Sequence, residues 1–89
     1  MSFHIEFSQE ALDELKFYKD SGNKKLYKKI FDLISSISET PFSGIGKPEP
    51  LKNNLSGFGS RRINKEYRLV YKIKNDTIEI LSIKGHYTN

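Results

Sequence analysis

Hydrophobic residues at the start of the chain recur in two different periods, which predict a strand followed by a helix. Residues 3–7 alternate between apolar and polar, a pattern typical of a half-buried strand. Apolar residues then recur at helical spacing over about 9–20. Ser8 stands where it can cap this helix, and Glu10 and Asp13 lie near the positive end of its dipole.

A second helix follows the breaker Ser21-Gly22-Asn23 and has the clearest amphipathic pattern in the chain. Its apolar positions are Leu26, Ile30, Leu33, Ile34 and Ile37. Lysines occupy the other face, which is the usual solvated face of such a helix. We expect the helix to end at Thr40-Pro41, because proline disfavours helical geometry in the residue before it.

The second half of the chain predicts a long loop and three strands. Residues 41–57 contain all three prolines and are expected to form a loop. Strands are expected at 58–63, 67–74 and 77–83, with short turns between them. The order β-α-α-β-β-β predicts an α+β two-layer sandwich, with two N-terminal helices packed on an antiparallel-rich sheet of about four strands. Residues 1–89 form one domain.

The alternation within the strands predicts which side chains share a face of the sheet. In the strand 67–74, Tyr67 and Tyr71 belong to the face with Leu69, which we expect to be the core face. Arg68 belongs to the opposite face. The preceding strand should place Arg62 on that opposite face as well. The two arginines are therefore expected together on an open, basic face, provided that no bulge shifts the register.

Composition and charge narrow the class of protein. Hydrophobic residues make up 36% of the chain, with six Phe and five Tyr, which is enough for a packed core. The absence of cysteine excludes a disulfide scaffold and a zinc–thiolate site. We see no signal peptide and no run of about 20 apolar residues, so we expect a cytoplasmic protein with no membrane partner.

The net charge of +4 is concentrated in the middle of the chain. Residues 41–72 hold seven lysines and arginines against Glu49 and Glu66: Lys47, Lys52, Arg61, Arg62, Lys65, Arg68 and Lys72. Such a surface suits a polyanion such as RNA. A soluble protein with a lysine-rich surface has the same composition, so charge alone leaves both interpretations open.

Few residues are equipped for chemistry. The chain has two histidines, His4 and His86, and no spacing that suggests a metal site or a phosphate-binding loop. A carboxylate, an imidazole and several guanidiniums suit transesterification at an RNA phosphate, which needs neither a metal nor a cofactor. In this interpretation Glu49 is the base, Arg68 stabilises the phosphate charge and His86 is the acid.

Each of these residues also has a purely structural interpretation. A loop glutamate such as Glu49 commonly forms a surface salt bridge that contributes little. Arg62 and Arg68 are solvated strand residues by default. His86 lies close to the last residue of the sequence, where chains often fray. His4 is most simply an outward-facing strand residue.

At the level of motifs, the segment TPFSGIGKPEPLKNNLSGFGSRRINKEYRLVYKI and the later GHY closely resemble the YoeB branch of the RelE/YoeB (Txe/YoeB) toxin–antitoxin superfamily. The resemblance is strongest from Thr40 to Tyr71 and extends over essentially the whole chain. It implies a RelE-like fold. It also implies the toxin of a type II toxin–antitoxin system, a ribosome-dependent mRNA endoribonuclease that inhibits translation by cutting mRNA in the A site of the 70S ribosome.

The resemblance implies roles for individual residues. Glu49 of KPEP matches the general base, Arg68 of RLVY the transition-state stabiliser, and His86 the general acid. Contacts with RNA are implied for Lys52, Arg62 and Tyr87, and we add the neighbouring basic residues to this set: Lys47 and Arg61. One departure is Gly59, which stands where the family often has tryptophan, so we expect a stacking or packing contact to be missing.

The resemblance also implies partners, and alternatives to cleavage stay open. The implied partners are a YefM-like antitoxin, operator DNA bound by the toxin–antitoxin complex, and a second copy in a homodimer. One alternative is a translation inhibitor that binds the ribosome or RNA without cleaving, or an operator-binding corepressor. Another is a ribonuclease that works without ribosomes. A ribonuclease that works without ribosomes is disfavoured, because an ordinary carboxylate is a weak base for a 2′-hydroxyl.

Overall fold

The structure is a computed structural model that describes residues 3–41, 44, 49–50 and 57–86, with the backbone alone described at 49–50 and 85–86. Its elements are β1 (His4–Phe7), α1 (Gln9–Asp20), α2 (Lys24–Glu39), β2 (Glu49–Pro50), β3 (Phe58–Arg62), β4 (Tyr67–Lys74) and β5 (Thr77–His86). The predicted β-α-α-β-β-β order is confirmed, with the short strand β2 added inside the predicted loop.

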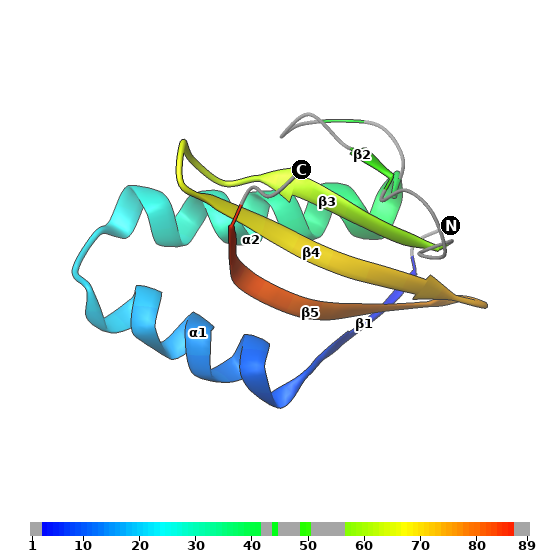
Figure 1. Cartoon of the computed structure of the whole chain (residues 1–89), viewed down its shortest axis with the longest axis horizontal. Coiled ribbons are helices and arrows are strands. Elements are labelled where there is room, and N and C mark those ends of the chain that lie inside the picture. Colours follow the sequence, from blue (N-terminus) through cyan, green and yellow to red (C-terminus); the bar gives the residue numbers. More distant parts are fainter. Residues whose placement is uncertain (1–2, 42–43, 45–48, 51–56, 87–89) are drawn as a thin grey trace.

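The strands form one mixed sheet in the order β1-β5-β4-β3-β2. The first strand, β1, runs parallel to β5, while the other neighbouring pairs are antiparallel. Figure 1 shows α1 and α2 joined by a short turn, and both helices contribute to the core against the sheet. The result is the predicted α+β two-layer sandwich.

Both helices begin at the residues that local sequence signals indicate. The Ser8 side chain accepts a hydrogen bond from the Ala11 backbone N–H at 3.0 Å and caps α1. Asn23 caps α2 in the same way through the Leu26 N–H at 3.1 Å. Gly22 lies between the helices with φ of +79°, a left-handed conformation that glycine adopts without strain.

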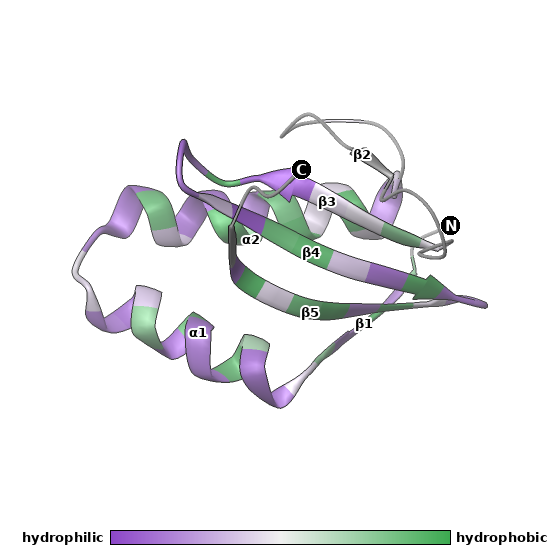
Figure 2. Ribbon diagram, viewed as in Figure 1, coloured by the Kyte–Doolittle hydropathy of each residue, from purple (hydrophilic) through white to green (hydrophobic). Residues whose placement is uncertain are grey.

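The core lies between the two layers. Its helical residues are Ala11, Tyr18, Ile30, Leu33, Ile34 and Ile37. Its residues from the sheet side are Ile63, Leu69, Tyr71, Ile78, Ile80 and Ile83. Figure 2 shows both helices banded by hydrophobic and hydrophilic residues, as expected of helices that bury one face. No helix in the described part of the chain is long and apolar enough to cross a bilayer.

Gly59 provides the space that the Tyr71 side chain occupies. The two residues are paired across β3 and β4. A Cβ atom at position 59 would lie 2.9 Å from both Cζ and Oη of Tyr71, closer than real contacts allow. The Tyr71 hydroxyl donates a hydrogen bond to the Pro41 carbonyl. Within the chain, the ring of a cross-strand neighbour therefore fills the space at this position.

Candidate functional site

Four neighbouring strands carry the five described residues that the sequence assigns to catalysis or contacts with RNA, with both Arg61 and Arg62 on β3. Glu49 lies on β2, Arg62 on β3, Arg68 on β4 and His86 on β5. The backbone of Glu49 pairs with Ser60, and that of His86 pairs with Tyr67 beside Arg68. The predicted contact residues Lys47, Lys52 and Tyr87 lie outside the described residues.

The two predicted phosphate-facing arginines are direct cross-strand partners. Arg62 and Arg68 are opposite each other in the β3–β4 register, so they share a face of the sheet. This confirms the expected common face, and the register shifts of β4 occur against β5 instead. Like charges directly opposite each other repel, so a bound anion would stabilise this arrangement.

Hydrogen bonds hold both guanidinium groups in defined positions. Arg68 is 8% exposed and donates from Nη1 to the Ser60 hydroxyl at 3.2 Å. Arg62 is half-buried and donates from Nε to the Asn64 carbonyl at 3.2 Å. Ser60 itself is 1% exposed and lies between Glu49 of β2 and Val70 of β4 in the register. Ser60 was not among the predicted site residues, although strand alternation already placed it on the same face as Arg62.

Arg61 does not lie on this face, which contradicts its predicted contact with phosphate. The side chain is fully buried on the helix side of the sheet. Its guanidinium donates to Ser36 Oγ at 2.9 Å, to the Thr40 carbonyl at 2.6 Å and to Tyr71 Oη at 3.4 Å. Successive residues of a strand point to opposite faces, so adjacent Arg61 and Arg62 cannot share one role. Arg61 instead interacts with the C-terminal end of α2, where the helix dipole is negative.

The end of the open face away from Arg62 and Arg68 carries acidic as well as basic side chains. A cavity of about 330 Å³ lies there, lined by Glu6, Lys72, Lys74, Asn75, Asp76, Thr77 and Glu79. Its three carboxylates accompany two lysines, which makes it a poor receptor for phosphate. Among the described residues, no group of three or more His, Cys, Asp or Glu side chains is arranged to hold a metal ion.

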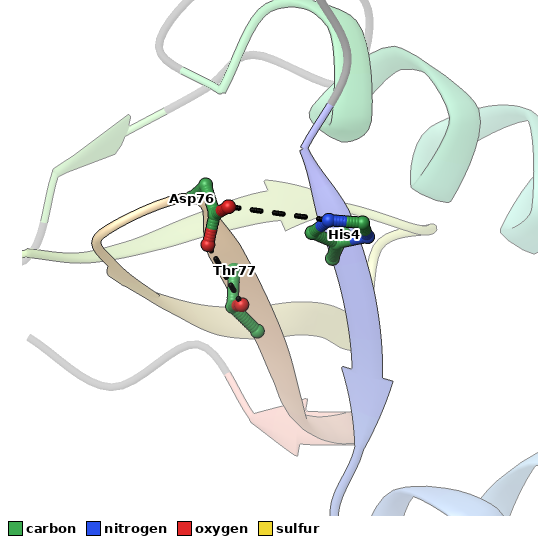
Figure 3. Close-up of polar contacts among 3 residues, drawn as sticks. All are labelled: His4, Asp76 and Thr77. Carbon is green, nitrogen blue, oxygen red and sulfur yellow. Dashed lines mark hydrogen bonds and ion pairs between the residues drawn. The ribbon is translucent and has the colours of Figure 1, made fainter.

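The first histidine belongs to this far end. Figure 3 shows the His4 side chain of β1 facing Asp76, which lies in the turn before β5. Thr77, the first residue of β5, also contacts Asp76. The His4 Nε2 to Asp76 Oδ2 distance is 3.9 Å, and both side chains are about four-fifths exposed. Such a pair contributes little to stability. The prediction that His4 faces outward is confirmed.

Comparison with known families supports the resemblance carried by the motifs. Residues 7–87 match the family described as the YoeB-like toxin of bacterial type II toxin–antitoxin systems. The chain belongs to this YoeB-like toxin family. The matched segment contains all the residues discussed for the site, from Lys47 to Tyr87.

Relatives within the YoeB-like family are similar over nearly their whole length. The toxin YoeB of Synechocystis sp. is 58% identical over 83 residues, covering 93% of this chain and 95% of the relative. The structure of a YoeB dimer from Staphylococcus aureus is similar with a TM-score of 0.85 at 45% identity, covering 98% of this chain and all of that one. A heterotetrameric YoeB–YefM toxin–antitoxin complex from the same species has a YoeB chain with a TM-score of 0.80, 45% identity and the same coverage. The predicted family and fold are thereby confirmed.

Proposed function

We propose that this chain is a toxin that cuts mRNA in the A site of the ribosome by metal-independent acid–base transesterification. The observation that carries the proposal is the register of the sheet. The backbones of Glu49, Arg62, Arg68 and His86 lie on four neighbouring strands, with the two arginines opposite each other and the acidic cavity at the other end of the sheet. A protein that only binds RNA requires the arginines but not the acid and the base.

The chemistry needs an acid and a base on opposite sides of one phosphate. Glu49 takes the proton of the 2′-hydroxyl, and the 2′-oxygen forms a bond to phosphorus. Arg62 and Arg68 stabilise the additional negative charge of the phosphorane. The bond from phosphorus to the 5′-oxygen then breaks, and His86 supplies the proton that this oxygen needs. The products are a 2′,3′-cyclic phosphate and a free 5′-hydroxyl.

The spacing of the strands is compatible with Glu49 as the base and His86 as the acid. Strands β2 and β5 are separated by β3 and β4, and three spacings of about 4.8 Å give about 14 Å between their backbones. A base on β2 and an acid on β5 are therefore too far apart to neutralise each other directly. A phosphate bound by Arg62 and Arg68 would lie over the two strands between β2 and β5.

The ribosome supplies what this small site lacks. An ordinary carboxylate is a weak base for a 2′-hydroxyl. Alignment of the 2′-oxygen with the phosphate can compensate by lowering the barrier several kcal/mol. We therefore expect cleavage of mRNA on the ribosome and little cleavage of free RNA.

A translation reaction with a defined mRNA, read by primer extension, tests the proposal. Wild type should give new 5′ ends in the A-site codon, and Glu49→Ala should lose them by a factor of at least about 10². Glu66→Ala is the matched control, because Glu66 is an exposed acid in the β3–β4 turn. The same reaction without ribosomes should leave the mRNA intact.

Three outcomes would contradict the proposal. If wild type and Glu49→Ala give the same cleavage pattern, Glu49 is not the base. If wild type stops translation and leaves the mRNA intact, the chain is a binding inhibitor, which is the alternative function. Rapid cleavage of free RNA would contradict the dependence on ribosomes.

The partners follow from the family. We infer that the chain is neutralised by a YefM-like antitoxin, since a relative at 45% identity occurs in a YoeB–YefM complex. We also infer a homodimer, since the similar S. aureus protein is a dimer. Operator DNA is expected to bind the toxin–antitoxin complex. Native mass spectrometry of the chain alone and with antitoxin tests both assemblies.

A further inference from the structure

The last part of β5 leaves the regular pattern of the sheet shortly before His86. Its partners on β4 change from Tyr71↔Ile80 to Val70↔Ser82 and then to Arg68↔Gly85. Two extra residues are therefore present on β5 between Ile80 and Gly85, which bulge and bend the strand. Figure 1 shows this bend as the sharp curve of β5 in its last residues. The pairing with β1 ends at Ile80, so the outer edge of the bent part lacks a strand neighbour among the described residues.

Polar side chains of α1 and its cap take the place of that neighbour. One oxygen of Glu14, Oε1, accepts hydrogen bonds from the Ile83 N–H at 2.6 Å and the Lys84 N–H at 3.1 Å. It also accepts one from the Ser82 hydroxyl at 3.3 Å. Bonds from backbone N–H groups to a carboxylate are stronger than neutral ones. The bulge is therefore held chiefly from the Glu14 side.

Two further contacts fix the carbonyl groups of the same segment. The Tyr18 hydroxyl donates to the Ile83 carbonyl at 2.9 Å, and the Ser8 hydroxyl donates to the Leu81 carbonyl at 2.8 Å. Burial raises the pKa of Tyr18 above its usual range, so its hydroxyl remains a donor. The Lys84 ammonium lies 3.9 Å from the centre of the Phe17 ring, which adds a contact between α1 and β5.

We propose that Glu14 is a positioning residue for His86, acting through the backbone of Ile83 and Lys84. The inference rests on the proposed function, in which His86 protonates the leaving oxygen. Lys84 precedes His86 by two residues, so the direction in which β5 leaves the bulge determines where the histidine backbone lies. An acid on the inward side of an amphipathic helix is unfavourable unless it is paired, and the bulge provides its partners.

An mRNA with a sulfur atom in place of the 5′-oxygen at the cleavage site distinguishes this role from general support of the fold. A thiolate leaves without help from an acid, because thiols have much lower pKa values than alcohols. At saturating ribosome concentration, Glu14→Ala should slow single-turnover cleavage of normal mRNA at least about tenfold. It should slow cleavage of the sulfur-containing mRNA less than about twofold, as should His86→Ala.

Two variants serve as matched controls. Glu14→Gln should restore most of the rate on normal mRNA, because a single oxygen accepts all three bonds and glutamine retains one. Glu10→Ala removes an exposed carboxylate from the same helix and should leave both rates unchanged. Equal slowing of both substrates by Glu14→Ala, or no slowing of either, would overturn the inference.

Amide hydrogen exchange tests whether Glu14 holds the backbone of Ile83 and Lys84, and this test does not depend on catalysis. Exchange at Ile83 and Lys84 should accelerate at least about tenfold in Glu14→Ala and much less in Glu14→Gln. Unchanged exchange in Glu14→Ala would overturn the inference even if cleavage slowed. If wild type itself failed to cleave mRNA, the proposed function would be contradicted. The exchange rates would still decide whether Glu14 holds Ile83 and Lys84.

Discussion

At the residue scale, Arg61 and Arg62 lie on opposite faces of the sheet although they are adjacent in the sequence. Arg61 is buried against the end of α2, where two of its bonds reach Ser36 and Thr40. Arg62 is half-buried on the open face opposite Arg68. A charged group that is buried and fully hydrogen-bonded is costly to disturb, because its partners lose their bonds in the interior.

We expect Arg61→Met to lower the free energy of unfolding by about 2–4 kcal/mol, measured by urea denaturation. Arg62→Met should lower it by less than about 1 kcal/mol, because its side chain is partly solvated. Cleavage on the ribosome should show the reverse order, with the larger loss in Arg62→Met. Equal effects of the two substitutions on stability would contradict the assignment of Arg61 to the core.

The Ser60 hydroxyl provides a second residue-scale prediction, because it accepts the bond that orients Arg68. Ser60→Ala should slow single-turnover cleavage about tenfold while lowering the unfolding free energy by no more than about 1–2 kcal/mol. Ser35→Ala, on the exposed surface of α2, is the control and should change neither quantity. A Ser60→Ala variant with wild-type cleavage would mean that Arg68 needs no support from this hydroxyl.

At the element scale, the helices were predictable and the ends of the sheet were not. The bounds expected for the first helix, 9–20, agree with α1, because capping and amphipathic periodicity are local signals. Strand β2 was missed because only pairing with β3 defines it. The bulged end of β5 was missed because its stabilising partner, Glu14, is 69 residues away from Ile83. The burial of Arg61 could have been predicted from the sequence, because alternation along the strand puts Arg61 and Arg62 on opposite faces.

The contact between α1 and β5 also predicts a pH dependence of stability. Burial, with smaller contributions from Tyr67, Glu14 and Glu66, raises the pKa of Tyr18. Above about pH 10 the unfolded chain releases this proton while the folded chain keeps it, so the free energy of unfolding falls as pH rises. In Tyr18→Phe this fall should be less steep, as measured by urea denaturation between about pH 9 and 11. Parallel curves for the two proteins would contradict the assignment.

At the scale of the whole molecule, an 89-residue chain has a small core and a narrow margin of stability. A partner that binds only the folded state adds to that margin by mass action. The proposed antitoxin should therefore act on stability as well as on activity.

A YefM-like antitoxin at about one hundred times its dissociation constant should raise the unfolding free energy by about 2.7 kcal/mol. Differential scanning fluorimetry should show an unfolding temperature that rises with antitoxin concentration, and cleavage on the ribosome should stop over the same range. Inhibition without any change in unfolding temperature would contradict binding to the folded toxin.

The pairing of β1 with β5 joins residues 73 positions apart, such as His4 and Thr77. Contacts of such long sequence separation form slowly, after more local structure. At about 5–20 residues per second, several seconds pass between synthesis of β1 and synthesis of its partner. A nascent chain consequently cannot assemble the sheet that carries Glu49, the arginines and His86 until its last strand has been made. Under the proposed function, the order of the strands therefore protects the ribosome that produces the chain during synthesis.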